Sequence, residues 1–172
     1  MDNHTPSLEF SHLPVMLDEV IKISSPIKGG TFIDCTFGGG GYSKELLQFS
    51  KLKVKGLDRD SSVKEIGKRL EKKFPQRFKF YQTKFSHLDT IAKDLVDVVI
   101  FDLGLSSIQL NDMKRGFSFK SNESLDMSMG LNKISAQDVI NNLSELELKL
   151  IIKIFGEEKE AARIAKNIVK FR

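Results

Sequence analysis

The sequence predicts an α/β protein in which alternating strands and helices build a parallel β-sheet. Two observations lead to this prediction. Short runs of β-branched and aromatic residues alternate with amphipathic segments of helical length, and a run of four glycines, Gly38–Gly41, directly follows the first apolar run. The chain has 172 residues, of which 40% are hydrophobic, so it can bury one sizeable core with a small appendage.

The first elements are a helix, a strand and a second helix. A helix is expected over residues 12–24, because Pro14 suits its first turn and apolar residues follow at helical spacing. The run over 31–36 is typical of a buried parallel strand. The glycine loop comes next, and a helix is expected over 42–49.

The middle of the chain repeats the order of strand and then helix. A second strand is expected over 53–57, and Ser61 or Ser62 is expected to cap the helix that follows it. Pro75 ends that helix, and a short third strand is expected over 78–81.

A further helix over 87–95 is expected to precede a fourth buried strand over 98–101. Asp102 stands at the carboxyl end of that strand. Parallel strands place their carboxyl ends at one edge of a sheet, and ligands bind at that edge. The loops expected there carry Gly40, Asp58, Phe85 and Asp102.

The character of the sequence changes after the fourth strand. Residues 104–133 are polar and lack sustained periodicity, which is long for a bare connection and indicates a functional or substrate-ordered loop. Two or three helices follow. Ser144 and Glu147 predict a capping box for a helix that ends at Gly156, and a last helix is expected over 157–172.

The glycine loop with its flanking strands predicts a nucleotide pocket. Glycines let the backbone turn sharply and approach a ligand closely. The helix after the loop would point its N–H groups at the ligand, and Asp58, about 20 residues on, stands where an acid can bind ribose hydroxyls. These residues alone leave a nicotinamide-dependent oxidoreductase open as an alternative.

Composition narrows the classes of protein and partner. The single cysteine, Cys35, allows no internal disulfide, and the sequence shows neither a leader nor a membrane span, so we expect a cytoplasmic protein with no membrane partner. The net charge of +4 allows a polyanionic partner. The densest basic stretch, residues 64–79, is interpreted as a solvated face rather than an RNA-binding patch. His4, His12 and His87 have no ligand spacing among them, so no metal is expected.

Several long motifs carry a family resemblance. In chain order they are HLPVMLDEV, DCTFGGGGYS, GLDRD, FDLGLSSIQL, RGFSF, LDMSM and FGEEKEAARIAKNIV. This set resembles the bacterial ribosomal RNA small-subunit methyltransferase H family, formerly called MraW, over almost the whole chain. The resemblance implies a Rossmann-like class I methyltransferase that uses S-adenosyl-L-methionine. It also implies that the methyl group goes to the exocyclic N4 of a decoding-region cytidine in 16S ribosomal RNA, within the small ribosomal subunit.

The resemblance also implies a division of the chain and a set of site residues. It gives a partial cofactor-binding core over 1–110, a motif-bearing loop over 111–133 and the start of an inserted helical domain over 134–172. The implied cofactor contacts are Gly40, Gly41, Tyr42, Asp58, Phe85, Asp102 and Gln109. Asp102 is also the candidate catalytic acceptor, and its role at the cofactor's ammonium group or at the cytosine amine stays open.

This sequence departs from the family pattern at four positions. Tyr42 replaces the usual histidine after the glycines, and Ile108 replaces a proline. Ser128 and Gly130 replace an arginine and an acid, which affects any RNA or loop contact expected there.

Length is the largest departure from the pattern, since family members continue for well over a hundred residues beyond the position that matches Arg172. We therefore expect an N-terminal portion that binds cofactor weakly and does not methylate RNA alone. A non-catalytic RNA-binding or assembly fragment is a further alternative. The oligomeric state stays open, with a dimer among the alternatives.

Overall fold

The structure of the chain is a computed structural model that describes residues 14–131 and 133–172. The chain divides into two compact units, Met1–Ile108 and Gln109–Arg172. The first two residues of the expected opening helix, His12 and Leu13, lie outside the described residues, as does His4.

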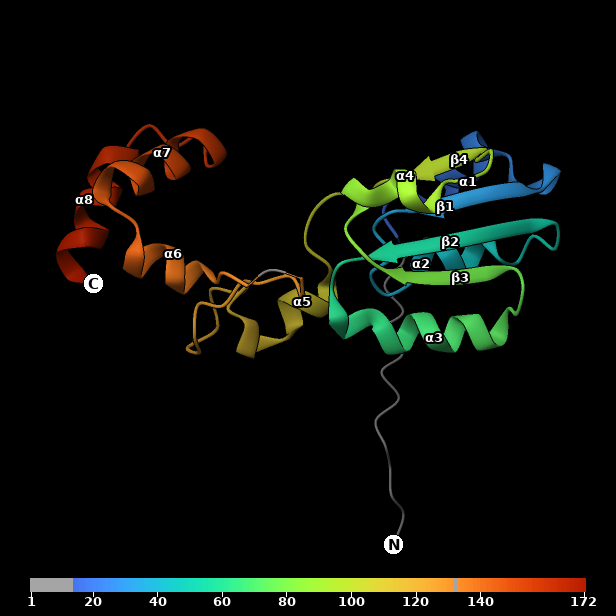
Figure 1. The fold of residues 1–172 in the computed structure, drawn as a ribbon, viewed down its shortest axis with the longest axis horizontal. Helices are drawn as coiled ribbons and strands as arrows, with labels where there is room; N and C mark the ends of the chain where they lie inside the picture. Colours follow the sequence, from blue (N-terminus) through green and yellow to red (C-terminus); the bar gives the residue numbers. More distant parts are fainter. Residues whose placement is uncertain (1–13, 132) are drawn as a thin grey trace, which may run out of the picture. The chain divides into compact units, whose positions relative to one another are not determined.

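The first unit is built on a four-stranded parallel sheet. Its strands are β1 (Gly30–Asp34), β2 (Leu52–Asp58), β3 (Phe78–Gln82) and β4 (Val98–Ile100). Figure 1 shows their order across the sheet, β3-β2-β1-β4. This is the strand order of the first part of a doubly wound sheet, so the expected Rossmann-like α/β fold is confirmed.

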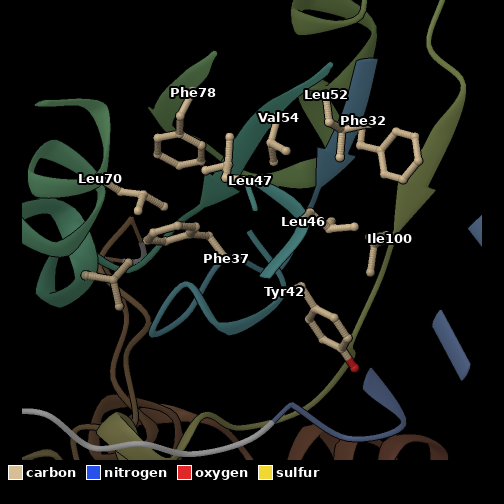
Figure 2. Close-up of a cluster of buried hydrophobic side chains, with 11 residues drawn as sticks. Phe32, Phe37, Tyr42, Leu46, Leu47, Leu52, Val54, Leu70, Phe78 and Ile100 are labelled. Carbon is tan, nitrogen blue, oxygen red and sulfur yellow. The ribbon is translucent and has the colours of Figure 1, made fainter. Parts of the chain in front are cut away.

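Helices cover both faces of the sheet. α1 (Leu17–Ser24), α2 (Gly41–Leu46) and α3 (Lys64–Lys73) contribute to a larger core on one face, and α4 (Leu88–Ile91) packs against a smaller core on the other. Neighbouring residues of a strand point to opposite faces, so one strand supplies side chains to both cores. Figure 2 shows ten labelled residues of the larger core: Phe32, Phe37, Tyr42, Leu46, Leu47, Leu52, Val54, Leu70, Phe78 and Ile100. The smaller core is formed by Ile33, Cys35 and Leu57.

Two helix starts differ from those expected. α1 begins at Leu17, because Met16 has a left-handed backbone (φ 53°) that separates Pro14 from the helix. The prediction of a serine cap for α3 is wrong, because its N-cap residue is Val63 and Ser61 and Ser62 lie in a 3₁₀ turn, Ser61–Val63, that precedes it. Asp60 caps that turn, since its carboxylate accepts a hydrogen bond from the Ser62 N–H at 3.0 Å. A carboxylate accepts such a bond as well as a hydroxyl does.

The fourth helix and the fourth strand are shorter and more exposed than expected. The helix ends at Ile91, since the backbone of Ala92 (φ −87°, ψ 57°) leaves the helical region. Within the described sheet β4 is a terminal strand that pairs with β1, and Val99 is 40% exposed while Phe101 is 48% exposed. The prediction of a fully buried fourth strand is therefore wrong.

The second unit contains three longer helices. They are α6 (Ala136–Asn142), α7 (Glu145–Phe155) and α8 (Ala161–Phe171). The predicted capping box of Ser144 and Glu147 is confirmed, as is the end of α7 at Gly156. α7 and α8 pack on each other, and small residues of α8, Ala161 and Ala165, are buried there.

The polar stretch before these helices has structure of its own. It contains α5 (Ser107–Asn111) and a 3₁₀ turn over Met113–Arg115. Two segments of this stretch are paired, since the Met127 N–H donates to the Arg115 carbonyl at 2.8 Å. A Cβ on Gly116 (φ 70°) would lie 2.6 Å from the Ser124 carbonyl oxygen, so the close approach of the two segments requires glycine.

Gly67 lets α3 pack closely on β3. A Cβ placed on Gly67 would lie 2.3 Å from Cγ of Phe80, and the Phe80 N–H donates to the Glu71 carboxylate at 2.8 Å. We expect Gly67→Ala to lower the free energy of unfolding by about 1–3 kcal/mol, because overpacking against the ring outweighs the better helix propensity of alanine. Urea unfolding followed by circular dichroism measures this change.

The matched control for that substitution is Lys72→Ala on the exposed side of the same helix. We expect it to change stability by less than about 0.5 kcal/mol. A Gly67→Ala protein as stable as the original would show that α3 is not held against β3 in this way.

Candidate functional site

The carboxyl ends of the strands form the candidate site, and Asp58 lies at the end of β2. One oxygen of its carboxylate accepts a hydrogen bond from the Gly38 N–H at 2.8 Å, and the other accepts from the Asp60 N–H at 2.9 Å. Burial raises the pKa of Asp58 above its ordinary value, while the backbone N–H groups of Asp60, Gly38 and Arg59 act in the opposite direction. The two oxygens have four lone pairs together, so at least one lone pair remains for a ligand hydroxyl.

Asp34, at the end of β1, is a second carboxylate of this edge, and it was absent from the residues expected from the sequence. Its side chain is fully buried. It accepts hydrogen bonds from the Ser43 hydroxyl at 2.8 Å and from the Thr36 N–H at 3.3 Å. The acid that opens the motif DCTFGGGG was the available signal, since it directly precedes the glycine loop.

Burial also controls the charge of Asp34. It raises the pKa of this carboxyl group to about 6, although the two hydrogen bonds oppose the shift. The charges of Asp58 and Asp102 add to the increase. The charges of two neighbouring carboxyl groups therefore act on Asp34, which gains a proton just below neutral pH.

Asp102 follows β4 and is tied to β1 through the backbone. Its N–H donates to the Thr36 hydroxyl oxygen at 2.8 Å. Asp102 is an exposed residue, so its carboxylate is open to a ligand. Thr36 thereby joins the ends of two neighbouring strands, because its own N–H also donates to Asp34.

The four loop glycines fall into two pairs. A Cβ on Gly40 would lie 2.8 Å from the Phe37 ring, and a Cβ on Gly41 would lie 2.5 Å from Pro14, so packing inside the protein requires both glycines. Around Gly38 and Gly39 the nearest atoms to such a Cβ lie at 3.8 Å. The open side of the loop is therefore at Gly38 and Gly39, two positions earlier than the pair Gly40 and Gly41 implied by the resemblance.

Tyr42 is part of the core rather than of the open edge. Its ring lies in the larger core (Figure 2), and its hydroxyl donates to the Val15 carbonyl. Burial raises the pKa of Tyr42, and the charges of Asp102 and Asp34 add to that shift. Tyr42 and the two glycines before it can meet a ligand through their backbone, while the side chain of Tyr42 serves the fold.

Phe85 belongs to an exposed aromatic pair. It starts the 3₁₀ turn after β3 and is 45% exposed. Its ring meets Phe101 edge to face, with the ring centroids 5.6 Å apart. Phe101 follows β4, which is the opposite terminal strand of the described sheet, and the sequence offered no reason to pair the two rings.

Gln109 is the first residue of the second unit. It lies in α5 and is 6% exposed. The structure thus places six of the seven expected residues in the first unit and Gln109 in the other.

The last two features concern metal sites and membrane-spanning helices among the described residues. In this part of the chain, no group of three or more His, Cys, Asp and Glu side chains is arranged to hold a metal ion. Among the helices of residues 14–131 and 133–172, none is long and apolar enough to cross a membrane.

Comparison with known proteins gives two close sequence relatives. The chain is 45% identical over 161 residues to the ribosomal RNA small subunit methyltransferase H of Bartonella bacilliformis, covering 94% of this chain and 48% of that protein. It is 42% identical over 168 residues to the protein of the same name from Rickettsia canadensis, covering 96% of this chain and 54% of that protein. The chain thus spans about half the length of the curated relatives it matches.

A solved structure and a family model were also matched. The crystal structure of MccD protein aligns with a TM-score of 0.38 and 15% identity over 90% of this chain and 88% of that one, which is too weak a likeness to add to the description of the fold. The sequence model of the MraW methylase family matches residues 9–172. By that match, which agrees with the motifs and with the identity to both relatives, the chain belongs to the MraW methylase family.

Proposed function

We propose that the chain forms the cofactor-binding part of a methyltransferase that uses S-adenosyl-L-methionine and acts on 16S ribosomal RNA in the small ribosomal subunit. The proposed product carries the methyl group on the exocyclic N4 of a decoding-region cytidine. The observation that carries the proposal is the carboxyl edge of the sheet, where Asp58 and the open side of the glycine loop lie together in a member of the MraW methylase family. The names of the relatives support ribosomal RNA as the substrate.

The residues of this edge suit the proposed cofactor. Asp58 lies at the end of β2, where its carboxylate can accept a hydrogen bond from a ribose hydroxyl. The ligand has a sulfonium and an ammonium group, and the carboxylates of Asp34 and Asp102 supply negative charge nearby. Phe85 offers an exposed ring for the adenine, and Gln109 is proposed as a further contact.

The proposed chemistry depends mainly on orientation. When bound, S-adenosylmethionine supplies a methyl group that its sulfonium already activates. The protein must hold the attacking nitrogen in line and keep water away. The cytosine amine is a poor nucleophile, since its lone pair is delocalised into the ring. Asp102 is proposed to accept a hydrogen bond from an N–H of that amine, which helps localise the lone pair as the bond forms.

A base in structured RNA must leave its stack before it can reach such an edge. The stretch Arg115–Asp126 is proposed to guide it. The stretch is anchored at both ends, because the Arg115 guanidinium donates to the Ser128 carbonyl and the Ala136 N–H donates to the Asp126 carbonyl at 2.9 Å.

Cofactor binding by this chain is the first test. We expect weak calorimetric binding of S-adenosylmethionine and none of NAD⁺, since the oxidoreductase alternative uses the same type of loop. Asp58→Asn is expected to weaken binding by about tenfold or more, because a hydrogen bond to a charged group is lost. In a ¹⁵N-labelled sample the amides of Gly38 and Gly39 are expected to shift with added cofactor.

The matched control for that variant is Asp89→Asn, which removes an exposed carboxylate from α4. It is expected to leave the affinity unchanged. Equal affinity in both variants would contradict the role of Asp58, and preference for NAD⁺ would overturn the choice of cofactor.

The charge of Asp34 predicts a pH dependence of cofactor binding. Its carboxyl group has a pKa of about 6, and its ionised form favours a cationic ligand. Affinity should therefore rise with pH through about 6 and level off above 7, with a loss of up to about tenfold at pH 5. We expect Asp34→Asn to remove this dependence between pH 5 and 7, as measured by calorimetry.

The stability of the cofactor-free chain should depend on the ionisation of Asp34 in the opposite direction to the cofactor affinity. The folded pKa of about 6 is above the ordinary value of 3.8, so ionisation of Asp34 lowers the free energy of unfolding as pH rises from about 4 to 6. Affinity that follows the same pH course in Asp34→Asn and in the original chain would contradict this account.

The methylated atom is tested on isolated 30S subunits that lack the modification. The assay uses this chain fused to the remaining residues of the Bartonella bacilliformis relative, because the chain spans about half of that protein. Mass spectrometry of the nucleosides is expected to find N4-methylcytidine. The same fusion with Asp102→Asn is expected to be slower by about a hundredfold. A methyl group on another atom would overturn the proposed position.

A further inference from the structure

One segment accounts for the net positive charge of the chain. Residues 64–79, which form α3 and the start of β3, contain seven lysines and arginines and two acidic residues, so this segment carries a charge of +5. The whole chain carries +4. All other residues together therefore carry −1, and the positive charge of the chain belongs to this one segment.

Three of the four lysines of α3 share one exposed side. Lys64, Lys68 and Lys72 follow one another at intervals of four residues, which places them on the same face of the helix over about 12 Å. All three are exposed. The opposite side of the helix is apolar and packs into the larger core through Leu70. Figure 1 shows α3 running beside β3, whose Lys79 is also exposed.

The acidic residues inside the segment do not cancel this charge. Glu65 pairs with Lys68 at 3.1 Å and Glu71 pairs with Lys79 at 3.4 Å. The Glu65–Lys68 pair is exposed and therefore weak, while Glu71 is partly buried and also accepts a hydrogen bond from the Phe80 N–H. Each acid offsets one lysine, which leaves an excess of five positive charges along the helix and the adjacent strand.

The position of this face suits a ligand that also reaches the candidate site. α3 begins six residues after Asp58, so Lys64 stands at the end of the helix nearest the carboxyl edge of the sheet. The edge itself is acidic, with Asp34, Asp58 and Asp102. The phosphate backbone of a polyanion is therefore attracted to the flank of the unit, while the acidic edge favours the cationic cofactor that is proposed to bind there.

We propose that the exposed face of α3, defined by Lys64, Lys68 and Lys72, binds the phosphate backbone of the RNA substrate. This proposal replaces the interpretation from the sequence, which took residues 64–79 as a solvated face. The inference rests on the proposed function, because that function supplies a structured RNA as the partner. Lysines bind phosphates as point charges without reading sequence, so this face positions the RNA and leaves the choice of base to other parts of the protein.

The test measures RNA binding by the 172-residue chain over a range of salt concentration. The probe is a hairpin with the sequence of the 16S decoding region, followed by fluorescence anisotropy between about 50 and 200 mM salt. The variant replaces Lys64, Lys68 and Lys72 by glutamine, which keeps the helix propensity. We expect its affinity to fall about tenfold or more and the slope of log K against log salt to lose about 2 to 3 in magnitude.

The matched control replaces Lys51, Lys53 and Lys93 by glutamine, which removes the same charge from exposed positions of the same unit. It is expected to keep the original slope. A second variant with arginine at the three α3 positions is expected to keep the original affinity. Circular dichroism and calorimetry with S-adenosylmethionine on the same samples separate a loss of RNA binding from unfolding and from failure of the proposed function.

Three results would overturn the proposal. Equal losses in the α3 variant and the control variant would show that the charge acts without a defined surface. An original chain that does not bind the hairpin at low salt would exclude an RNA contact here. Binding to anionic lipid vesicles without binding to RNA would assign the face to a different partner.

Discussion

The buried carboxylate of Asp34 is the constraint on which the candidate site depends. A buried charge is costly unless hydrogen bonds satisfy it, and here Ser43 of α2 and the Thr36 N–H donate to it. Thr36 then accepts a bond from the Asp102 N–H. One carboxylate at the end of β1 therefore links the glycine loop, the helix after it and the end of β4. The same burial that requires these partners also raises the pKa of Asp34 to about 6.

The glycines of the loop are required for two separate reasons, close packing inside the protein and open access to the edge of the sheet. Gly40 and Gly41 have no side chain because Phe37 and Pro14 occupy the space that a Cβ would need. Gly38 lies on the open side, and its N–H holds the carboxylate of Asp58 in place. Packing accounts for half of the run, and access to the edge of the sheet accounts for the other half. A glycine-rich sequence by itself therefore does not tell which of its residues face a ligand.

The first unit also separates its charges. Three carboxyl groups, those of Asp34, Asp58 and Asp102, lie at the ends of β1 and β2 and after β4, while an excess of lysine and arginine lies on α3 and β3. A cationic cofactor and a polyanionic substrate need opposite surroundings, and this arrangement provides both within one small unit. The proposed roles of the edge and of the α3 face are therefore compatible with each other.

Several features could be predicted from the sequence because they depend on local pattern and spacing. They are the order of the elements, the parallel sheet, the capping box of Ser144 and Glu147, and the place of Asp58 at a strand end. The entry of Tyr42 into the core and the contact between Phe85 and Phe101 could not be predicted in this way. Both outcomes depend on contacts between segments far apart in the chain. Local periodicity carries no information about such contacts, so the direction of a side chain and the pKa of a buried acid follow only once the segments have met.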